Sequence, residues 1–298
     1  MRVQHEGRQR RSPSLLYPFL LFCSMLLKNF RKLGIGGKRL NILAIGDVVG
    51  DIGVQTLERH LRKIKSEHQV DFVIVNGENA AGVGITPSLA HRIYNAGADV
   101  ITLGNHVWGK KEIARFLEDD GYILRPANLA DLAPGRGHGI FQVKSKMICV
   151  INLIGRCGMD FGPDNPFSCV SRLLRETARL SDFTVIDFHA NATSEKIAMA
   201  YHVDGKVSAL WGTHTHVQTA DERVFPGGMG YITDLGMTGP MHSVLGIRPE
   251  QSLRMFRGEV PVRFETAPGP CKICGAVFCL DDRDFHCCEV RRIQFMQG

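Results

Sequence analysis

Six short apolar segments, each rich in Val and Ile, constrain the fold of this chain more than any other feature. Such segments, mostly free of polar residues, are typical of strands that are buried on both faces of a sheet. Five of the six finish in carboxylate, amide or imidazole side chains. The segments are NILAIGD, DFVIVNGEN, ADVITLGNH, KMICVINLIG, DFTVIDFHA and KVSALWGTHTH, which start at residues 41, 71, 98, 146, 182 and 206.

Helical patterns lie between several of these segments. Residues 55–67 place Leu57, Leu61 and Ile64 on one face, and TPSLAHRIYNAG begins with Thr86 as the expected N-cap. KKEIARFLEDDG and SCVSRLLRETARLSD supply two more amphipathic stretches. The alternation of strand and helix predicts an α/β fold. Residues 259–295 are expected to form strands and turns without a helix.

The N-terminal residues 1–40 differ in composition from the rest. They carry nine Lys and Arg residues and one acid, and they contain an apolar stretch, Leu15–Leu27, that Pro18 and Ser24 interrupt. This stretch is short for a membrane-spanning helix and lacks a clear cleavage site. An export signal, a peripheral membrane anchor and a non-structural extension are the alternatives. We favour the last, with residues 41–298 as a single domain and a cytoplasmic location.

The charge of the remaining residues gives no sign of a nucleic-acid-binding face. The net charge is +6, but residues 41–298 contain two more acids than bases. No stable complex with nucleic acid is therefore expected. Phosphate-loop, dinucleotide-binding and nucleophile-elbow motifs are not found in the sequence.

The nine cysteines follow no compact disulfide pattern. Cys271 and Cys274 form a C-x-x-C pair, with Cys279, Cys287 and Cys288 nearby, so a zinc site has to be considered. Adjacent residues of a strand point to opposite faces, which argues against ligation by both Cys287 and Cys288. We interpret these cysteines as structural thiols in a reducing compartment.

The polar strand ends are candidate ligands because open α/β sheets bind ligands beyond the carboxyl ends of their strands. Each residue alone could equally cap a helix or serve a turn. Five strand ends with the same chemistry are harder to explain by turns. Their side chains are carboxylate, amide and imidazole: Asp47, Glu78, Asn79, Asn105, His106, His189, His214 and His216.

This set of donors indicates metal chemistry. Oxygen and imidazole ligands without thiolate suit iron or manganese best, with zinc as an alternative. The number of donors exceeds what one ion needs and suits two ions that share a bridging carboxylate. Such two-metal centres are common in enzymes that displace groups at phosphorus.

The motifs GDVVG, NGENAAG, GNHVW, DFHANATSEK, GTHTHVQTAD and TDLGMTGP, in this order, closely resemble the YmdB-like family. This family of calcineurin-type metallophosphoesterases includes 2',3'-cyclic nucleotide phosphodiesterases, and the resemblance spans residues 41–295. It implies a four-layer sandwich of two packed sheets flanked by helices. The wider superfamily has D-x-H and G-D-x-x-D where this chain has GDVVG and GEN, which favours the YmdB-like branch.

The resemblance also implies roles for the polar residues. Asp47, Glu78, Asn79 and His216 would bind one metal ion, and Glu78, Asn105, His189 and His214 the other. His106 would be the general acid. The implied activity is hydrolysis of a cyclic nucleotide by a metal-activated hydroxide, most readily a 2',3'-cyclic nucleoside monophosphate.

Other functions remain open on the sequence. The same centre could serve a phosphomonoesterase or a phosphodiesterase acting on another ester, and a metal-bearing regulatory protein is an alternative from a different class. Asn191 stands where the family is expected to carry an acid. The expected partner is a small nucleotide substrate. A homo-oligomer is compatible with the sequence, and contact with a membrane depends on residues 1–40.

Overall fold

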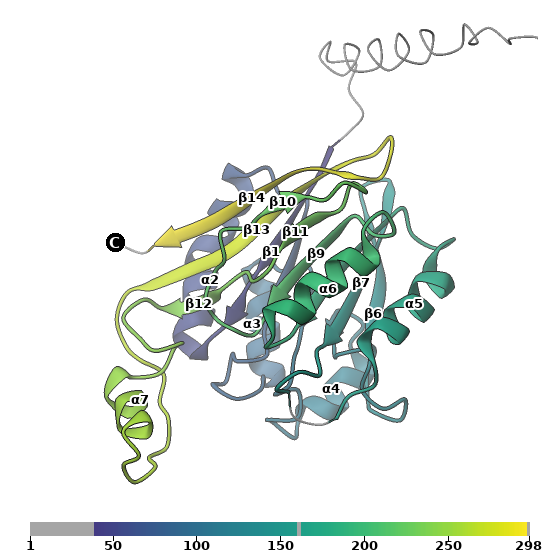
Figure 1. Cartoon of the computed structure of the whole chain (residues 1–298). Coiled ribbons are helices and arrows are strands. Elements are labelled where there is room, and N and C mark those ends of the chain that lie inside the picture. Colours follow the sequence, from purple (N-terminus) through teal and green to yellow (C-terminus); the bar gives the residue numbers. More distant parts are fainter. Residues whose placement is uncertain (1–38, 160–161, 297–298) are drawn as a thin grey trace, which may run out of the picture. The chain divides into compact units, whose positions relative to one another are not determined.

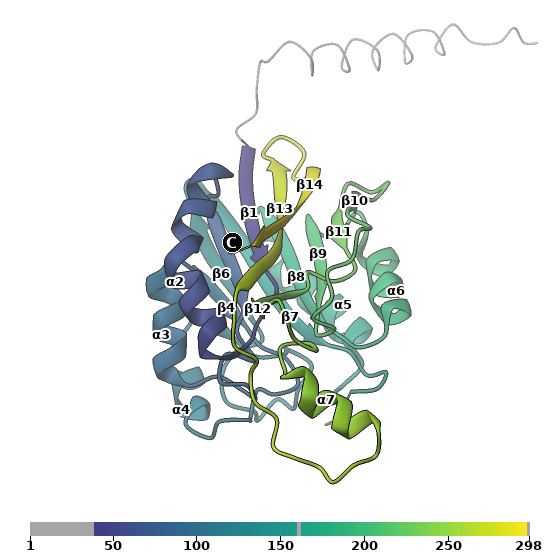
Figure 2. The same cartoon turned by 90° about the vertical axis from the view of Figure 1, so that its left-hand side faces the viewer.

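The computed structural model describes residues 39–159 and 162–296, and Figures 1 and 2 show their arrangement. The expected extension lies outside the described residues, except that Arg39 and Leu40 already belong to the first strand. In the described residues, no helix has the length and apolar character that a membrane span requires.

The first sheet has eight strands in the order β2-β12-β13-β1-β3-β4-β5, with β14 also paired to β13. β1, β3 and β4 run parallel, whereas β13 is antiparallel to β1 and to β14. The strands are β1 (Arg39–Ile45), β2 (Asp47–Val48), β3 (Phe72–Asn76), β4 (Val100–Thr102), β5 (Ile123–Leu124), β12 (Met237–Pro240), β13 (Cys271–Asp281) and β14 (Cys287–Met296).

The second sheet has six strands in the order β10-β11-β9-β8-β7-β6. β7, β8 and β9 run parallel to one another, and β6 closes one edge antiparallel to β7. The strands are β6 (His138–Val143), β7 (Lys146–Ile154), β8 (Phe183–His189), β9 (Ala209–Thr213), β10 (Arg223–Val224) and β11 (Gly230–Ile232).

Alternating side chains place the two sheets face to face. In β1, Ile42 and Ala44 pack in a core shared with Val150 and Val185 of the second sheet. Leu43 and Ile45 point the other way, into a separate core with the helices. Both faces of the strand are therefore buried, and this explains its unbroken apolar sequence.

Helices cover the outer face of each sheet. α2 (Gly50–Glu67) and α3 (Pro87–Ala96) pack on the first sheet, with α4 (Ile113–Asp119) in the same core. α5 (Pro166–Thr177) and α6 (Thr193–Val203) pack on the second sheet, and Figure 2 shows the two groups of helices on opposite sides. The expected four-layer α/β sandwich is confirmed.

The individual elements follow the sequence expectations with a few differences. All six apolar segments contain strands, and Thr86 caps α3 by accepting a hydrogen bond from the Leu89 amide. α5 begins at Pro166, earlier than expected, because Asn165 caps it and proline suits the first helical position. α6 and α7 (Pro249–Phe256) were not predicted. Residues 259–295 hold β13 and β14 and no helix, as expected.

Candidate metal centre

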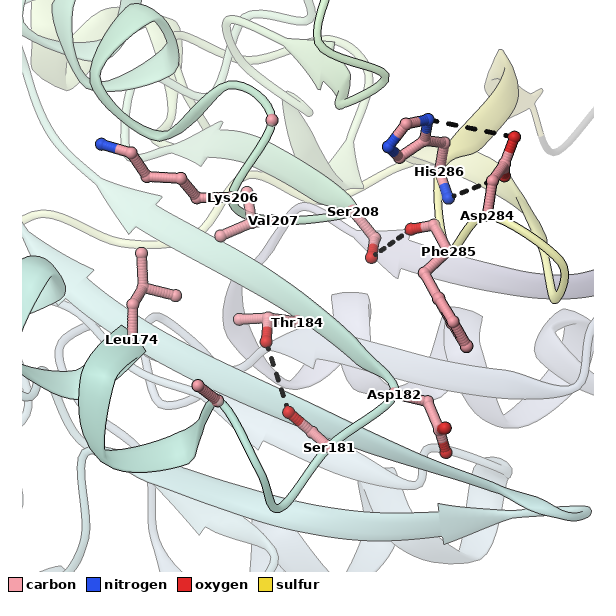
Figure 3. Close-up of a pocket in the computed structure, with 12 residues that line it drawn as sticks. Leu174, Ser181, Asp182, Thr184, Lys206, Val207, Ser208, Asp284, Phe285 and His286 are labelled. Carbon is pink, nitrogen blue, oxygen red and sulfur yellow. Dashed lines mark hydrogen bonds and ion pairs between the residues drawn. The ribbon is translucent and has the colours of Figure 1, made fainter.

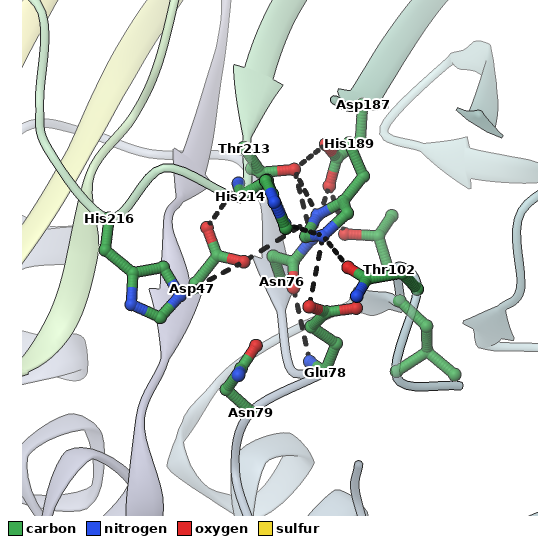
Figure 4. A network of polar contacts seen from close by, with 12 residues as sticks. Asp47, Asn76, Glu78, Asn79, Thr102, Asp187, His189, Thr213, His214 and His216 are labelled. Atoms are coloured by element: carbon green, nitrogen blue, oxygen red, sulfur yellow. Dashed lines mark hydrogen bonds and ion pairs between the residues drawn. The ribbon is translucent and has the colours of Figure 1, made fainter. Parts of the chain in front are cut away.

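The structure brings polar residues from both sheets together at the carboxyl ends of their parallel strands (Figure 4). His189, the last residue of β8, lies in the middle of this group and is fully buried. Its Nε2 is 3.0 Å from each of three atoms: Glu78 Oε1, Asn105 Oδ1 and His214 Nδ1. Glu78, His189 and His214 form the one group of three His, Cys, Asp or Glu residues in the described chain with the spacing of metal ligands.

Asp47 connects this group to the remaining candidates. Its Oδ1 lies 3.7 Å from His189 Nδ1 and 4.0 Å from His216 Nε2. Its Oδ2 accepts a hydrogen bond from the His214 amide at 3.0 Å. Asn79 lies beside Glu78 and lines the same cavity as His216. All the predicted site residues therefore lie in one region.

Two buried oxygens in this region lack a hydrogen-bond partner among the described residues. They are Oδ1 of Asp47 and Oδ1 of Asn79. A buried acceptor without a donor costs roughly 1–3 kcal/mol, and coordination to a cation would satisfy such an oxygen. Glu78 Oε1 and Asn105 Oδ1 also offer lone pairs close to the His189 and His214 nitrogens. The donor set fits a metal ion bound through oxygen and imidazole.

The mutual proximity of these groups changes their protonation. Burial lowers the pKa of His214 to about 3, and the positive charge of His189 acts in the same direction. Burial would also lower the pKa of His189, but the carboxylates of Glu78, Asp47 and Asp187 together outweigh it and raise that pKa to about 9. Burial would raise the pKa of Glu78, yet the two nearby imidazoles, His189 and His106, hold it below its usual value. Glu78 is thus a carboxylate in this centre.

A second layer of buried polar residues orients His189, and the sequence analysis missed it. The Thr213 hydroxyl lies 2.9 Å from His189 Nδ1 and donates to Asp187 Oδ1 at 2.8 Å. Thr102 and Asn76 donate to the other oxygen of Asp187. Burial raises the pKa of Asp187 to about 6. The available signal was a polar residue inside an apolar strand, as in VIDFH and VIVNG.

The loop after β9 holds its two histidines in an uncommon backbone conformation. His214 has φ 100° and His216 has φ 62°, where residues other than glycine rarely lie. The amide of Thr215, between them, donates to Asp234 Oδ2 at 3.2 Å. The same oxygen accepts a hydrogen bond from Lys196 of α6 at 2.6 Å, and both side chains are buried. This ion pair therefore braces the loop.

Gly104 is a further residue that the analysis of polar strand ends did not single out. A Cβ at this position would lie 2.2 Å from Glu78 Oε2 and 2.4 Å from His189 Nε2. A larger residue would displace both side chains. The glycine of GNH is therefore required by the close approach of its backbone to the centre.

His106 lies at the edge of the group, and its side chain is 36% exposed. Its Nδ1 is 3.4 Å from Glu78 Oε1, and its backbone amide donates to Glu78 Oε2. The hydrogen bond to Glu78 raises the pKa of His106. Because Nδ1 faces Glu78, Nε2 is the ring nitrogen left to meet a bound molecule.

The remaining sequence candidates lie elsewhere. Cys271 and Cys274 are buried in β13, and no cysteine in the described ranges belongs to a metal-ligating group. Cys149 is likewise buried, in β7. Asn191 is exposed in the turn before α6.

A cavity of about 620 Å³ opens over the candidate centre, within the size range of small-molecule sites. Glu78, Asn79, His106, His214 and His216 line it. A smaller cavity of about 270 Å³ contains none of the predicted site residues (Figure 3). There Ser181 pairs with Thr184, and Ser208 donates to the Phe285 carbonyl. The larger cavity is the candidate active site.

Solved structures have the same fold. A phosphatase from Mycoplasma pneumoniae is 34% identical, with a TM-score of 0.82 over 87% of this chain and 94% of that one. A protein from Thermus thermophilus, also 34% identical, has a TM-score of 0.81 over 87% of this chain and 100% of that one. The NAD nucleotidase of Haemophilus influenzae shares the fold alone. It is 13% identical to this chain, with a TM-score of 0.56 over 87% of this chain and 57% of that one.

The fold is that of the metallophosphoesterases, with the polar cluster at the carboxyl ends of the strands of both sheets. A family model described as YmdB-like protein matches residues 43–293. A 2',3'-cyclic-nucleotide 2'-phosphodiesterase of Bacillus subtilis is 44% identical over 257 residues, which are 85% of this chain and 96% of that relative. The chain belongs to the YmdB-like family. The expectation of a phosphoric ester hydrolase is confirmed by these relatives.

Proposed function

We propose that this chain is a dinuclear metal-dependent phosphodiesterase that hydrolyses 2',3'-cyclic nucleoside monophosphates. The observation that supports it most is the convergence of Glu78, Asn105 and His214 on His189 Nε2, beside a cavity of about 620 Å³ that Glu78 and His214 line. The 44% identity to a 2',3'-cyclic-nucleotide 2'-phosphodiesterase supports the choice of substrate.

The proposed ligands divide into two groups that share Glu78. The first group is Asp47, Glu78, Asn79 and His216, and it contains the two buried oxygens that lack a donor. The second group is Glu78, Asn105, His189 and His214, which meet at His189 Nε2 with distances of 3.0 Å. Oxygen and imidazole donors suit iron or manganese, and also zinc. When bound, two such ions lower the pKa of a coordinated water molecule and neutralise phosphate oxygens.

The protein's own residues supply position and a proton. Asp187, through Thr213, fixes the ring of His189, and the Lys196–Asp234 pair holds the loop of His214 and His216. His106 lines the cavity with Nδ1 turned toward Glu78. In our proposal, His106 donates its Nε2 proton to the ribose oxygen that leaves the phosphorus.

The proposed compartment is the cytoplasm, on the sequence argument that the cysteines follow no disulfide pattern. The proposed partner is the nucleotide itself. Residues 39–298 are proposed to fold as one domain, with residues 1–38 outside it.

One experiment tests the proposed function directly. The purified protein, loaded with Mn²⁺ or Fe²⁺, is assayed against 2',3'-cyclic nucleotides, 3',5'-cyclic nucleotides, linear dinucleotides and phosphomonoesters. We expect the highest kcat/KM for the 2',3'-cyclic compounds, loss of activity with a chelator and about two metal ions per chain, the stoichiometry of a two-metal centre. Faster hydrolysis of phosphomonoesters would assign the centre to a phosphatase. Full activity with a single tightly bound ion would contradict the dinuclear mechanism.

A further inference from the structure

The cavity over the candidate metal centre has a part that the proposed chemistry does not use. Beyond the polar floor, its wall is apolar or cationic, with Val83, Leu245, Ile247, Phe264, Lys110 and Arg263. At about 620 Å³ the cavity has room for more than the reacting phosphate, which occupies only the floor.

Two glycines hold one wall in place. A Cβ on Gly84 would lie 3.0 Å from Gly109 Cα, and a Cβ on Gly109 would lie 2.9 Å from the Gly84 nitrogen. The backbones therefore touch, and the segments that carry Val83 and Lys110 are packed against each other at the rim.

Another part of the cavity lining, at Leu245, is hydrogen-bonded to a proposed metal ligand. The Leu245 carbonyl lies 2.9 Å from His216 Nδ1. The turn that contains Leu245 is held by the segment after α7. Ala267 N donates a hydrogen bond to the Gly246 carbonyl, and Arg248 N donates one to the Glu265 carbonyl. Arg263 and Phe264 directly precede this braced stretch, so their backbone is anchored next to the centre.

Lys110 and Arg263 have no side-chain hydrogen bond or ion pair with residues 39–159 or 162–296. The acid nearest to Arg263 in sequence, Glu265, is paired with Arg248 at 3.0 Å. A cavity lined by two cations without an ion-pair partner among the described residues favours an anionic ligand. The reacting phosphate is already served by the metal ligands on the floor, so these cations are available for a second anionic group.

Phe264 adds a surface for a planar group. Its side chain lines the cavity and 45% of the residue is exposed, so the ring is accessible to a bound molecule. Stacking of a nucleobase on an aromatic side chain contributes about 1–3 kcal/mol and tolerates any base.

Resting on the proposed phosphodiesterase function, we propose that the rim formed by Lys110, Arg263 and Phe264 recognises a nucleotide that carries a second phosphate. Phe264 stacks on the base, and the two cations bind a phosphate at the 5' position of the same ribose. The preferred substrate is then a 2',3'-cyclic phosphate with a 5'-phosphate, either as a monoester or as the diester of a short RNA.

The test compares three substrates with the metal-loaded full-length protein. They are adenosine 2',3'-cyclic phosphate with a free 5'-hydroxyl, the same compound with a 5'-phosphate, and a dinucleotide that ends in a 2',3'-cyclic phosphate. A hydrogen bond to a charged group contributes about 1.5–3 kcal/mol, so we expect at least a roughly tenfold higher kcat/KM for the compounds with a second phosphate. The second and third compounds distinguish a monoester from a diester as the source of that phosphate.

Variants of the rim residues test which side chains produce the preference for a second phosphate. Arg263→Gln and Lys110→Gln should each reduce this preference, measured as the ratio of kcat/KM for the 5'-phosphate compound to kcat/KM for the 5'-hydroxyl compound. Lys111→Gln and Arg257→Gln are matched controls, because neither residue lines the cavity. Phe264→Ala should lower kcat/KM for all three nucleotides and spare ribose 2',3'-cyclic phosphate, which has no base to stack.

The outcomes separate this inference from the function on which it rests. Equal kcat/KM for all three substrates would overturn the rim proposal and leave the phosphodiesterase assignment intact. A preference that survives in the Lys110→Gln/Arg263→Gln double variant would also overturn it. Hydrolysis of none of the three would overturn both.

Discussion

His189 Nε2 lies 3.0 Å from Glu78 Oε1, although β8 and the strand before Glu78 belong to different sheets. This contact joins the two halves of the sandwich at the carboxyl ends of their parallel strands. The candidate centre therefore depends on the packing of sheet against sheet, since neither sheet alone carries all the proposed ligands.

The shared position of Glu78 predicts different losses of metal in two variants. Glu78→Gln should lower the content of both metals, because the carboxylate belongs to both proposed ligand groups. His216→Ala should remove mainly the ion shared with Asp47, which lies 4.0 Å from its Nε2. Metal analysis after dialysis, with activity in parallel, measures this. Identical metal losses in the two variants would show that the ligand division is wrong.

His106→Ala should lower turnover by about 10²–10⁴-fold, the usual contribution of a general acid. Metal content should stay near that of the wild type, because no proposed ligand is removed. A nitrophenyl ester, whose leaving group needs no proton, should lose less activity than a ribose-linked phosphate. Equal losses for both leaving groups, with both metals retained, would make His106 a residue that positions the substrate. Loss of metal would make it a ligand.

Gly104→Ala should reduce metal binding and activity, because the added methyl group would occupy the space of Glu78 Oε2 and His189 Nε2. Gly121→Ala is the matched control, since the nearest atom to its new Cβ would be 4.0 Å away. Metal affinity and thermal unfolding of both variants check this. Wild-type metal affinity in Gly104→Ala would show that the centre tolerates a displacement that the observed geometry forbids.

Lys196→Met should destabilise the protein by about 3–5 kcal/mol, because it leaves Asp234 buried without its cation. Lys63→Met removes an exposed partner of Glu67 and should cost at most about 1 kcal/mol. Urea unfolding of the two variants gives the comparison. A similar small cost for both would contradict the structural role of the buried pair in holding the His214–His216 loop.

A chain that begins at Lys38 should fold and keep full activity. β1 begins at Arg39, and residues 39–298 form a compact unit by themselves. Solubility, thermal unfolding and kcat/KM of the shortened and full-length proteins test the proposed boundary. A large loss in any of them would mean that residues 1–37 contribute to the folded domain.

The sequence by itself determined the strands, several helices and the candidate ligands. These depend on short-range physics: apolar runs form buried strands, Thr86 caps α3, and polar residues that end a strand project from the sheet edge. The family motifs then implied two sheets and a division of ligands.

Only the tertiary structure decided which strands share a sheet. Strands buried on both faces have similar apolar sequences in either sheet, so NILAIG and TVIDF carry no local sign of their different partners. Asp187 is linked to His189 through Thr213, which lies in another strand. Gly104 likewise contacts Glu78 and His189, which are distant from it in the chain. The Lys110–Arg263–Phe264 rim could not be predicted from the sequence either. Its members line one cavity only because the loop at 84 contacts the loop at 109, and because the segment after α7 packs on the turn at Leu245.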